Sequence, residues 1–403
     1  MHEWRIHQTS ILENRVTVRT DIPPMFGRKG AGASRAFHRQ IPGYAVTPLR
    51  SLPHLAEKWN VAGIYVKDES SRFSLNAFKG LGGSYAMFRI ICERLGLDPE
   101  QTGLKELTTG ASRDAIARME FVTCTDGNHG RGVSWAAGIF GCRAHVYMPY
   151  GTRPVRAEAI RSAGPAEVTV TDLSYDDTVK HALEMSRRYG WILIQDTAWD
   201  GYEKVPAWIV QGYLTMAEET AEELDRLHVL PTHIFLQAGV GSMAGGILAY
   251  FADRCGANKP TVAIVEPDVA DCIYQSAKSG EIRSVDGIAT TMMAGLNCGT
   301  PCKVIWPILR DYAEFCIAGP DAFAVNGMRT YAAGLHGDPV IVSGESGAST
   351  LGAAQMLMEE PDCQEVRKAM GIDQHSILLF ISTEGATDPE NYRKLVDSQT
   401  DAL

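Results

Sequence analysis

The chain has 403 residues, of which 45% are hydrophobic, and a formal net charge of −10. This length predicts two domains, and a negative charge without long runs of like charge argues against nucleic acid as a partner. No window reaches the roughly 18–20 consecutive apolar residues that a membrane span requires, and the N-terminus lacks a secretory signal, so we expect a cytoplasmic protein with no membrane partner. Nine cysteines without zinc-type pairs predict reduced thiols and no metal site.

Short β-branched runs alternate with longer helical patterns after a polar, Pro- and Gly-rich lead-in that ends at about residue 45. Strands are predicted at 63–69, 119–125, 142–149, 166–172, 191–197, 232–238, 261–267 and 376–382. Helices are predicted near 79–95, 129–140, 153–163, 175–189, 205–227 and 243–255. The alternation predicts an α/β fold with open, twisted, mainly parallel sheets flanked by helices. Ligands of such sheets bind where strands end, so the turns after the strands are candidate sites.

The first candidate turn is SLNAFKG, residues 74–80, which places Lys79 just inside a predicted helix. The positive end of the helix dipole and partial burial both favour a neutral amine, and a neutral amine is what Schiff-base chemistry requires. The alternative is a solvated surface lysine, which is common at such positions.

The second candidate is QAGVGSMAGG, residues 237–246, between a predicted strand and a predicted helix. Its glycines let backbone N–H groups converge on an anion at the helix N-terminus, so the loop indicates phosphate binding. The run Gly239-x-Gly241-x-x-Ala244 also fits a loose dinucleotide fingerprint, with Glu266 at the distance of a ribose contact. An NAD-dependent oxidoreductase is therefore an alternative of a different class.

Two further turns carry polar groups. In TDGNHGRG, residues 125–132, Asn128 could donate a hydrogen bond to a phenolate-like oxygen, although Asp-Gly sequences also form ordinary turns. In STEGATD, residues 382–388, the hydroxyl of Thr383 could meet a pyridine nitrogen or merely cap the turn. Each turn by itself leaves the choice of ligand open.

In their order and spacing the four turns resemble fold-type II pyridoxal-phosphate enzymes, the group of tryptophan synthase β and serine-threonine dehydratase. The resemblance implies a homodimer, with a large cofactor-binding domain of residues 1–84 and 196–403 and a small inserted domain of residues 85–195. It implies that Lys79 forms the Schiff base with pyridoxal 5′-phosphate, that Asn128 meets the ring oxygen and that Thr383 meets the pyridine nitrogen. The remaining implied cofactor contacts are Gly239, Val240, Gly241, Ser242, Gly245 and Gly246. The Gly- and Ser-rich composition of residues 326–350 suggests a further segment near the cofactor, in which Glu345 could border the ring.

Within that group, the segments NAFKG, TDGNHGRGVSWAA, QDTAW and STEGATD resemble the diaminopropionate ammonia-lyases. The chain reads TDGNH where dehydratases read SSGNH, which places the carboxylate of Asp126 where a hydroxyl is usual. The resemblance implies elimination of 2,3-diaminopropionate, in both D and L forms, to pyruvate and two ammonia. Two enantiomers require a base on each face of Cα: Lys79 is one, and the other is Asp126, with Asp196 in reserve. The implied substrate contacts are Thr125, Asp126, Gly127 and His129.

Other interpretations remain open from the sequence. A serine-threonine dehydratase or another β-eliminating lyase has the same cofactor motifs, and a noncatalytic ligand-binding regulator is a third class. Both Asp126 and Asp196 could be turn formers or helix caps, and Ser343 or Ser346 could merely cap the helix that Glu345 begins. Two cysteines that flank a Gly-rich segment, Cys272 and Cys298, either approach each other near an active site or are unrelated thiols.

Overall fold

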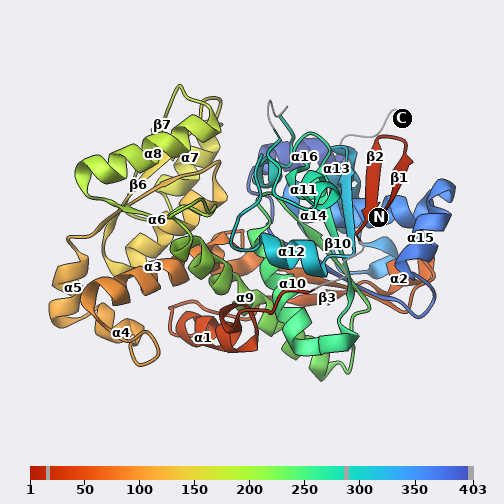
Figure 1. The fold of residues 1–403 in the computed structure, drawn as a ribbon, viewed down its shortest axis with the longest axis horizontal. Helices are drawn as coiled ribbons and strands as arrows, with labels where there is room; N and C mark the ends of the chain where they lie inside the picture. The colour runs from red at the N-terminus through yellow and green to blue at the C-terminus, as the bar shows by residue number, and fades with distance from the viewer. Residues whose placement is uncertain (15–18, 286–289, 398–403) are drawn as a thin grey trace. The chain divides into compact units, whose positions relative to one another are not determined.

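The computed structural model describes residues 1–14, 19–285 and 290–397. The chain forms two compact units, each built from separate stretches of sequence (Figure 1). Unit 1 comprises Met1–Pro23, Val46–Ser71 and Glu219–Leu403, and unit 2 comprises Pro24–Ala45 and Arg72–Glu218.

These boundaries differ from the inserted domain expected at residues 85–195. Unit 2 contains that stretch, but it also takes in residues 24–45, 72–84 and 196–218. The reason is packing: α3 (Lys79–Leu95) lies against α6 (Asn128–Phe140) and α1 (Arg28–His38), so the start of α3 belongs with the helices it contacts. Lys79 therefore lies in unit 2 and not in the larger unit.

Unit 1 is built on an eight-stranded sheet in the order β1-β2-β11-β10-β9-β12-β4-β3. Its five central strands are mutually parallel, and the strands at both edges pair antiparallel. The strand bounds are β1 His2–Ile6, β2 Thr9–Glu13, β3 Leu49–Ser51, β4 Gly63–Asp68, β9 His233–Gln237, β10 Thr261–Pro267, β11 Phe315–Gly319 and β12 Ile377–Ser382. All residues of β9 and β11 are buried, as expected where helices cover both faces of a parallel sheet.

The helices of unit 1 supply much of its core. Their bounds are α2 Pro53–Lys58, α10 Ser242–Cys255, α11 Cys272–Ser279, α12 Trp306–Tyr312, α13 Ala322–Ala333, α14 Glu345–Glu359, α15 Gln364–Met370 and α16 Pro389–Asp397. A hydrophobic cluster joins side chains of α13, α14 and α15 to side chains of the sheet. The long helix α9 (Lys204–Arg226) begins in unit 2 and ends in unit 1.

Unit 2 is built on a four-stranded sheet, all parallel, in the order β7-β6-β5-β8. The strands are β5 Glu120–Cys124, β6 Arg143–Met148, β7 Ala166–Val170 and β8 Ile192–Leu193. The other helices are α4 Leu104–Leu107, α5 Gly110–Ile116, α7 Pro154–Arg161 and α8 Tyr175–Tyr189. Along β6, Tyr147 packs in the cluster of α8, whereas Val146 and Met148 pack in the cluster of α7. Because successive strand residues face opposite ways, helices cover both faces of this sheet.

The predicted fold class, α/β with two mainly parallel sheets flanked by helices, is confirmed, while several elements were missed. The lead-in before residue 45 contains the β1–β2 hairpin, drawn in red beside the N-terminus in Figure 1, and α1. The hairpin turns at His7, whose φ is 51°, without the Asn-Gly or Asp-Gly sequence that signals such turns. The predicted strand 191–197 is reduced to the two residues of β8.

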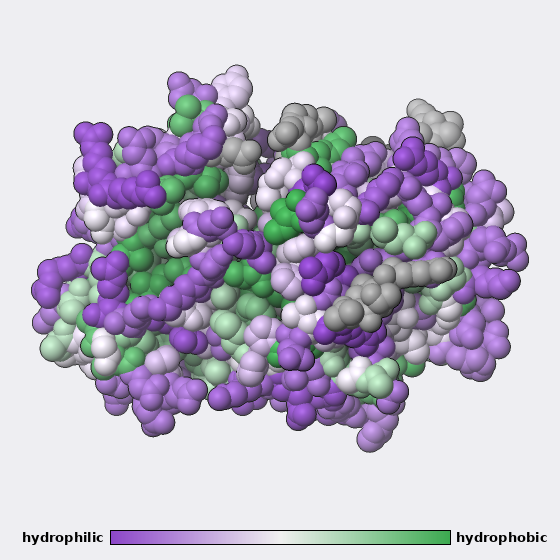
Figure 2. All heavy atoms as spheres, viewed as in Figure 1, coloured by the Kyte–Doolittle hydropathy of each residue, from purple (hydrophilic) through white to green (hydrophobic). Residues whose placement is uncertain are grey.

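Hydrophilic side chains cover much of the face shown in Figure 2. Among the helices that the described residues form, none combines the length and the apolar character needed to cross a membrane.

Candidate active site

Lys79 is the first residue of α3, as the sequence predicts. The start of α3 packs closely on α6: a Cβ added at Gly132 would lie 3.0 Å from the Lys79 carbonyl oxygen and 3.0 Å from the Gly80 nitrogen. A larger residue at position 132 would push the lysine backbone away, so glycine there fixes where the amine of Lys79 starts.

The amine of Lys79 pairs with Asp196. The Lys79 Nζ to Asp196 Oδ2 distance is 2.6 Å, and the two side chains are 20% and 11% exposed. Burial by itself would raise the pKa of Asp196, but the charge and the hydrogen bond of Lys79, with a further contribution from the neighbouring His129, outweigh it and lower the pKa to about 2. The carboxylate in turn stabilises the ammonium form of Lys79, an effect opposite to the neutral amine that the helix N-terminus favours.

Asp196 reaches this position because β8 ends early. Ile194 still donates its N–H to the Val122 carbonyl at 2.9 Å, but the N–H of Cys124 is taken at 3.0 Å by the side-chain oxygen of Gln195. The hydroxyl of Tyr202 accepts the N–H of Gln195 at 2.8 Å and donates to the Leu193 carbonyl at 3.1 Å. The side chain of Gln195 thus takes the place of the next main-chain hydrogen bond between β8 and β5. Asp196, the residue after it, turns away from the strand.

His129 is buried next to this carboxylate. Its Nε2 lies 2.9 Å from the Ile194 carbonyl, and because a carbonyl can only accept, Nε2 carries the hydrogen. Burial lowers the pKa of His129 and favours the neutral ring. Its Nδ1 then carries a lone pair, lies 3.9 Å from Asp196 Oδ2, and is without a hydrogen-bond partner among the described residues.

The turn that precedes α6 is organised by Thr125. Its hydroxyl accepts the N–H groups of Gly127 at 2.9 Å and Gly130 at 3.1 Å, and α6 begins at Asn128. Asp126 is partly buried in this turn, and Arg156 Nη1 lies 3.4 Å from its carbonyl oxygen. Burial raises the pKa of the Asp126 carboxyl to about 6, against the opposing charge of Arg156. A carboxyl with such a pKa exchanges protons near neutral pH.

The predicted phosphate loop lies in unit 1 and runs from the end of β9 into the first turns of α10, which contain Ser242, Gly245 and Gly246. Gly241 precedes α10 with φ of +86°, and a Cβ at Gly239 would lie 2.9 Å from Cys298 Sγ and 3.1 Å from the Gly295 carbonyl. The loop therefore wraps closely around positions that only glycine fits. The first N–H groups of a helix lack partners within the helix, so the start of α10 can bind an anion. These residues fit the phosphate of pyridoxal phosphate.

Thr383 directly follows β12 and is 3% exposed. Its hydroxyl oxygen lies 3.0 Å from Nε2 of Gln237, the last residue of β9. Glu345 is the first residue of α14, and its Oε1 accepts a hydrogen bond from Asn391 Nδ2 at 2.7 Å. Phosphate loop, Thr383 and Glu345 all belong to unit 1, whereas Lys79, Asn128 and both candidate bases belong to unit 2.

The dinucleotide alternative depended on Glu266 as a ribose ligand. Glu266 is fully buried, and its two carboxylate oxygens accept the backbone N–H groups of Ile273 at 2.8 Å and Tyr274 at 2.7 Å. The carboxylate holds the start of α11, so it is not presented to a ligand.

Cys272 and Cys298 both lie against the phosphate loop. Cys272 Sγ is 3.6 Å from the Gly239 carbonyl, Cys298 Sγ would touch a Cβ at Gly239, and neither thiol is in a disulfide bond. Of the two sequence interpretations, the structure supports the approach of these cysteines to one site.

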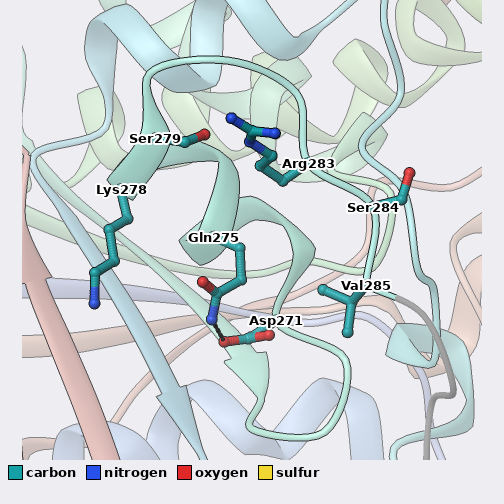
Figure 3. A pocket seen from close by; sticks show the side chains of 7 residues that line it. All are labelled: Asp271, Gln275, Lys278, Ser279, Arg283, Ser284 and Val285. Carbon is teal, nitrogen blue, oxygen red and sulfur yellow. Dashed lines mark hydrogen bonds between the residues drawn. The ribbon is translucent and has the colours of Figure 1, made fainter.

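A surface cavity of unit 1 shares no residue with the predicted site. Figure 3 shows its lining along α11 and the segment that follows: Asp271, Gln275, Lys278, Ser279, Arg283, Ser284 and Val285. Lys278 points away from Arg283, so the two cations do not converge on one point. Within the described ranges, no cluster of three His, Cys, Asp or Glu side chains could hold a metal ion.

The comparison with known proteins decides the family. Residues 41–369 match the family described as pyridoxal-phosphate dependent enzyme. The chain belongs to this family. Pyridoxal phosphate is therefore its cofactor, as the resemblance implied.

Individual members of the family are similar over nearly the whole chain. A diaminopropionate ammonia-lyase of Salmonella typhimurium is 47% identical, covering 90% of each chain, and one of Escherichia coli is 46% identical, covering 93% of each chain. The crystal structure of the holo Escherichia coli diaminopropionate ammonia-lyase matches with a TM-score of 0.91 and 44% identity over 96% of each chain. Threonine deaminase of Solanum lycopersicum, at 18% identity and a TM-score of 0.69, shares the fold.

Sequence reasoning missed the residues that hold other candidate site residues in place. Gln195 and Tyr202 hold the segment of Asp196, Arg156 lies beside the turn of Asp126, and Gln237 binds Thr383. Gln237 alone carried a signal, because a polar residue that ends a buried strand immediately before the phosphate loop needs a partner.

Proposed function

We propose that this chain is a carbon–nitrogen lyase that converts 2,3-diaminopropionate and water to pyruvate and two ammonia, with pyridoxal phosphate as cofactor. The observation that carries the proposal is the 2.6 Å pair of Lys79 and Asp196 beside the TDGNH turn, in a chain 47% identical to a diaminopropionate ammonia-lyase. Lyases of this type need a lysine at the cofactor aldehyde and an acid or base next to it.

Each residue that the family resemblance assigns to the cofactor would hold a different part of it. Lys79 would bond to the aldehyde, the Gly239–Gly246 loop would bind the phosphate, Asn128 the ring oxygen and Thr383 the pyridine nitrogen. When bound, the cofactor supplies an electron sink for the bond that breaks at Cα of the substrate. Glu345 would border the ring, with its carboxylate oriented by Asn391.

Two groups of unit 2 can move a proton at Cα. Lys79 Nζ would remove it on one face, and Asp196 would stabilise the ammonium that results. The carboxylate of Asp126 would serve the other face, because a pKa of about 6 leaves it both ionised at neutral pH and basic enough to accept a proton. Together they give a base for each enantiomer.

The TDGNH turn is the proposed substrate site, with contacts from Thr125, Asp126, Gly127 and His129. Diaminopropionate carries one more ammonium than serine, and the carboxylate of Asp126 can hold that charge where a dehydratase has a hydroxyl. His129 would contribute from the buried side of this site, because it is 4% exposed and its Nε2 is hydrogen-bonded to the Ile194 carbonyl.

The test measures pyruvate from D- and L-diaminopropionate and from D- and L-serine with wild type, Asp126→Asn and the exposed control Asp114→Asn. We expect diaminopropionate to be the best substrate and Asp126→Asn to reduce turnover of one enantiomer far more than the other. Asp114→Asn should leave both unchanged. Equal losses on both enantiomers would refute the two-base scheme, and faster turnover of serine would identify a dehydratase.

We further infer a homodimer in a reducing compartment such as the cytoplasm. The dimer follows from the family resemblance, and none of the nine cysteines, all within the described ranges, is in a disulfide bond, which fits a reducing environment. Light scattering of the purified holoenzyme tests the dimer: the mass expected is twice 43.9 kDa, and a mass of one chain would contradict it.

A further inference from the structure

Gln237 and Thr383 stand at the ends of neighbouring parallel strands in unit 1. β9 and β12 pair directly, with Phe235 opposite Phe380, and both strands end at the edge that carries the phosphate loop. Gln237 is 2% exposed and Thr383 is 3% exposed. At such burial the hydrogen bonds of the two side chains are fixed by the protein and not shared with bulk water.

The polarity of the bond between them follows from a third group. Nε2 of Gln237 lies 2.9 Å from the Ile381 carbonyl oxygen and 3.0 Å from Thr383 Oγ1. The atom that faces a carbonyl oxygen at this distance must be the amide nitrogen, because two oxygens would repel. An amide nitrogen has two hydrogens and accepts none, so the oxygen of Thr383 is the acceptor. The hydrogen of the Thr383 hydroxyl must then point to something else.

From this geometry we propose that Gln237 is a positioning residue that keeps Thr383 a hydrogen-bond donor toward the cofactor, so that Thr383 is matched to an unprotonated pyridine nitrogen. A nitrogen with a lone pair can accept this hydrogen, whereas a protonated nitrogen would meet a second donor. The inference rests on the proposed place of Thr383 at the ring, and it adds the residue that sets the direction of that bond.

The other end of the same amide gives independent support. Oε1 of Gln237 is buried and has no hydrogen-bond partner among the described residues. A buried polar atom left without a partner costs about 1–3 kcal/mol, so the amide is not there for general stability. What it supplies is the pair of donors on Nε2, and glutamate, its closest analogue, would offer acceptors in their place.

Two variants reverse or remove this polarity. Gln237→Glu would accept the hydrogen of Thr383 and leave the hydroxyl able only to accept from the ring. Gln237→Met keeps the length of the side chain and lets the hydroxyl turn either way. The matched control is Gln211→Met, because Gln211 is also a buried amide, with Nε2 bonded to the Gly30 carbonyl in unit 2.

The experiment loads each protein with pyridoxal phosphate labelled with ¹⁵N in the ring and follows the ¹⁵N resonance from mildly acidic to mildly alkaline pH. In wild type and Gln211→Met we expect the resonance of an unprotonated pyridine, independent of pH. In Gln237→Glu it should move to the position of a protonated ring, and in Gln237→Met it should become dependent on pH. These shifts report on the ring directly and do not depend on turnover.

A protonated ring in wild type, or a resonance of unprotonated pyridine that does not change with pH in Gln237→Met, overturns the inference. If Gln237→Glu fails to fold, Gln237→Met and wild type still decide it. A wild-type protein that binds no pyridoxal phosphate contradicts the proposed function instead, so the two failures are distinguishable.

Discussion

The carboxyl of Asp126 should weaken the folded protein at neutral pH, so that Asp126→Asn is more stable than wild type. Burial raises the pKa of Asp126 from its ordinary value of 3.8 to about 6. A group with a raised folded-state pKa contributes its stability below the unfolded value and loses it as the pH rises through the folded value. One pH unit between the two values corresponds to about 1.4 kcal/mol, so ionisation of Asp126 costs about 3 kcal/mol above pH 6. Asparagine avoids this cost.

Urea unfolding of the cofactor-free protein at about pH 3.5, pH 5 and pH 8 measures this effect. The advantage of Asp126→Asn over wild type should grow with pH, and most of the growth should lie between the two pKa values. Asp114→Asn, an exposed change in α5 of the same unit, should show no such trend. If Asp126→Asn were less stable than wild type at about pH 8, or if its advantage did not change with pH, the raised pKa of a buried Asp126 carboxyl would be contradicted.

Two other substitutions test the ion pair of Asp196 and the phosphate loop. Asp196→Asn should destabilise the protein by about 2 kcal/mol at neutral pH, since the pKa of Asp196 is lowered from 3.8 to about 2. The difference should disappear as the pH falls from about 3.8 to about 2 in urea unfolding, and a difference that persists at the acid end would argue against the ion pair with Lys79. Gly239→Ala should weaken pyridoxal phosphate binding about tenfold or more in fluorescence titration, because the new Cβ would lie 2.9 Å from Cys298 Sγ and the overpacking would displace the loop. Gly32→Ala, where a Cβ has room, should bind as wild type does.

Periodicity in the sequence predicted the regular elements well where helices are amphipathic. The bounds of α3 and α8 are those predicted, residues 79–95 and 175–189. β11, with the sequence FCIAG, was missed because only Phe315 and Ile317 are of residue types that strongly favour strands, whereas alanine and glycine do not. The strand predicted at 191–197 looked long because its apolar run continues to Ile194, whereas the side chain of Gln195 takes over the hydrogen bond that the strand would need.

The turns of the candidate site could be named from the sequence one by one, since glycines, Asn128 and Thr383 stand in recognisable sequence patterns, and their roles stay predictions. Their partners were not. Lys79 and Asp196 are 117 positions apart, and Gln237 and Thr383 are 146 positions apart, so only the folded sheets bring them together. The pKa of Asp126 could not be predicted either, because it depends on burial in the fold and on the charge of Arg156.

Reduction of the holoenzyme with borohydride, followed by mass spectrometry of its peptides, tests the central claim most directly. If Lys79 bonds to the cofactor aldehyde, reduction fixes a phosphopyridoxyl group on the peptide that contains NAFKG, and Lys79→Ala loses that adduct. A colourless protein, or an adduct on a different lysine, would contradict the assignment of this site.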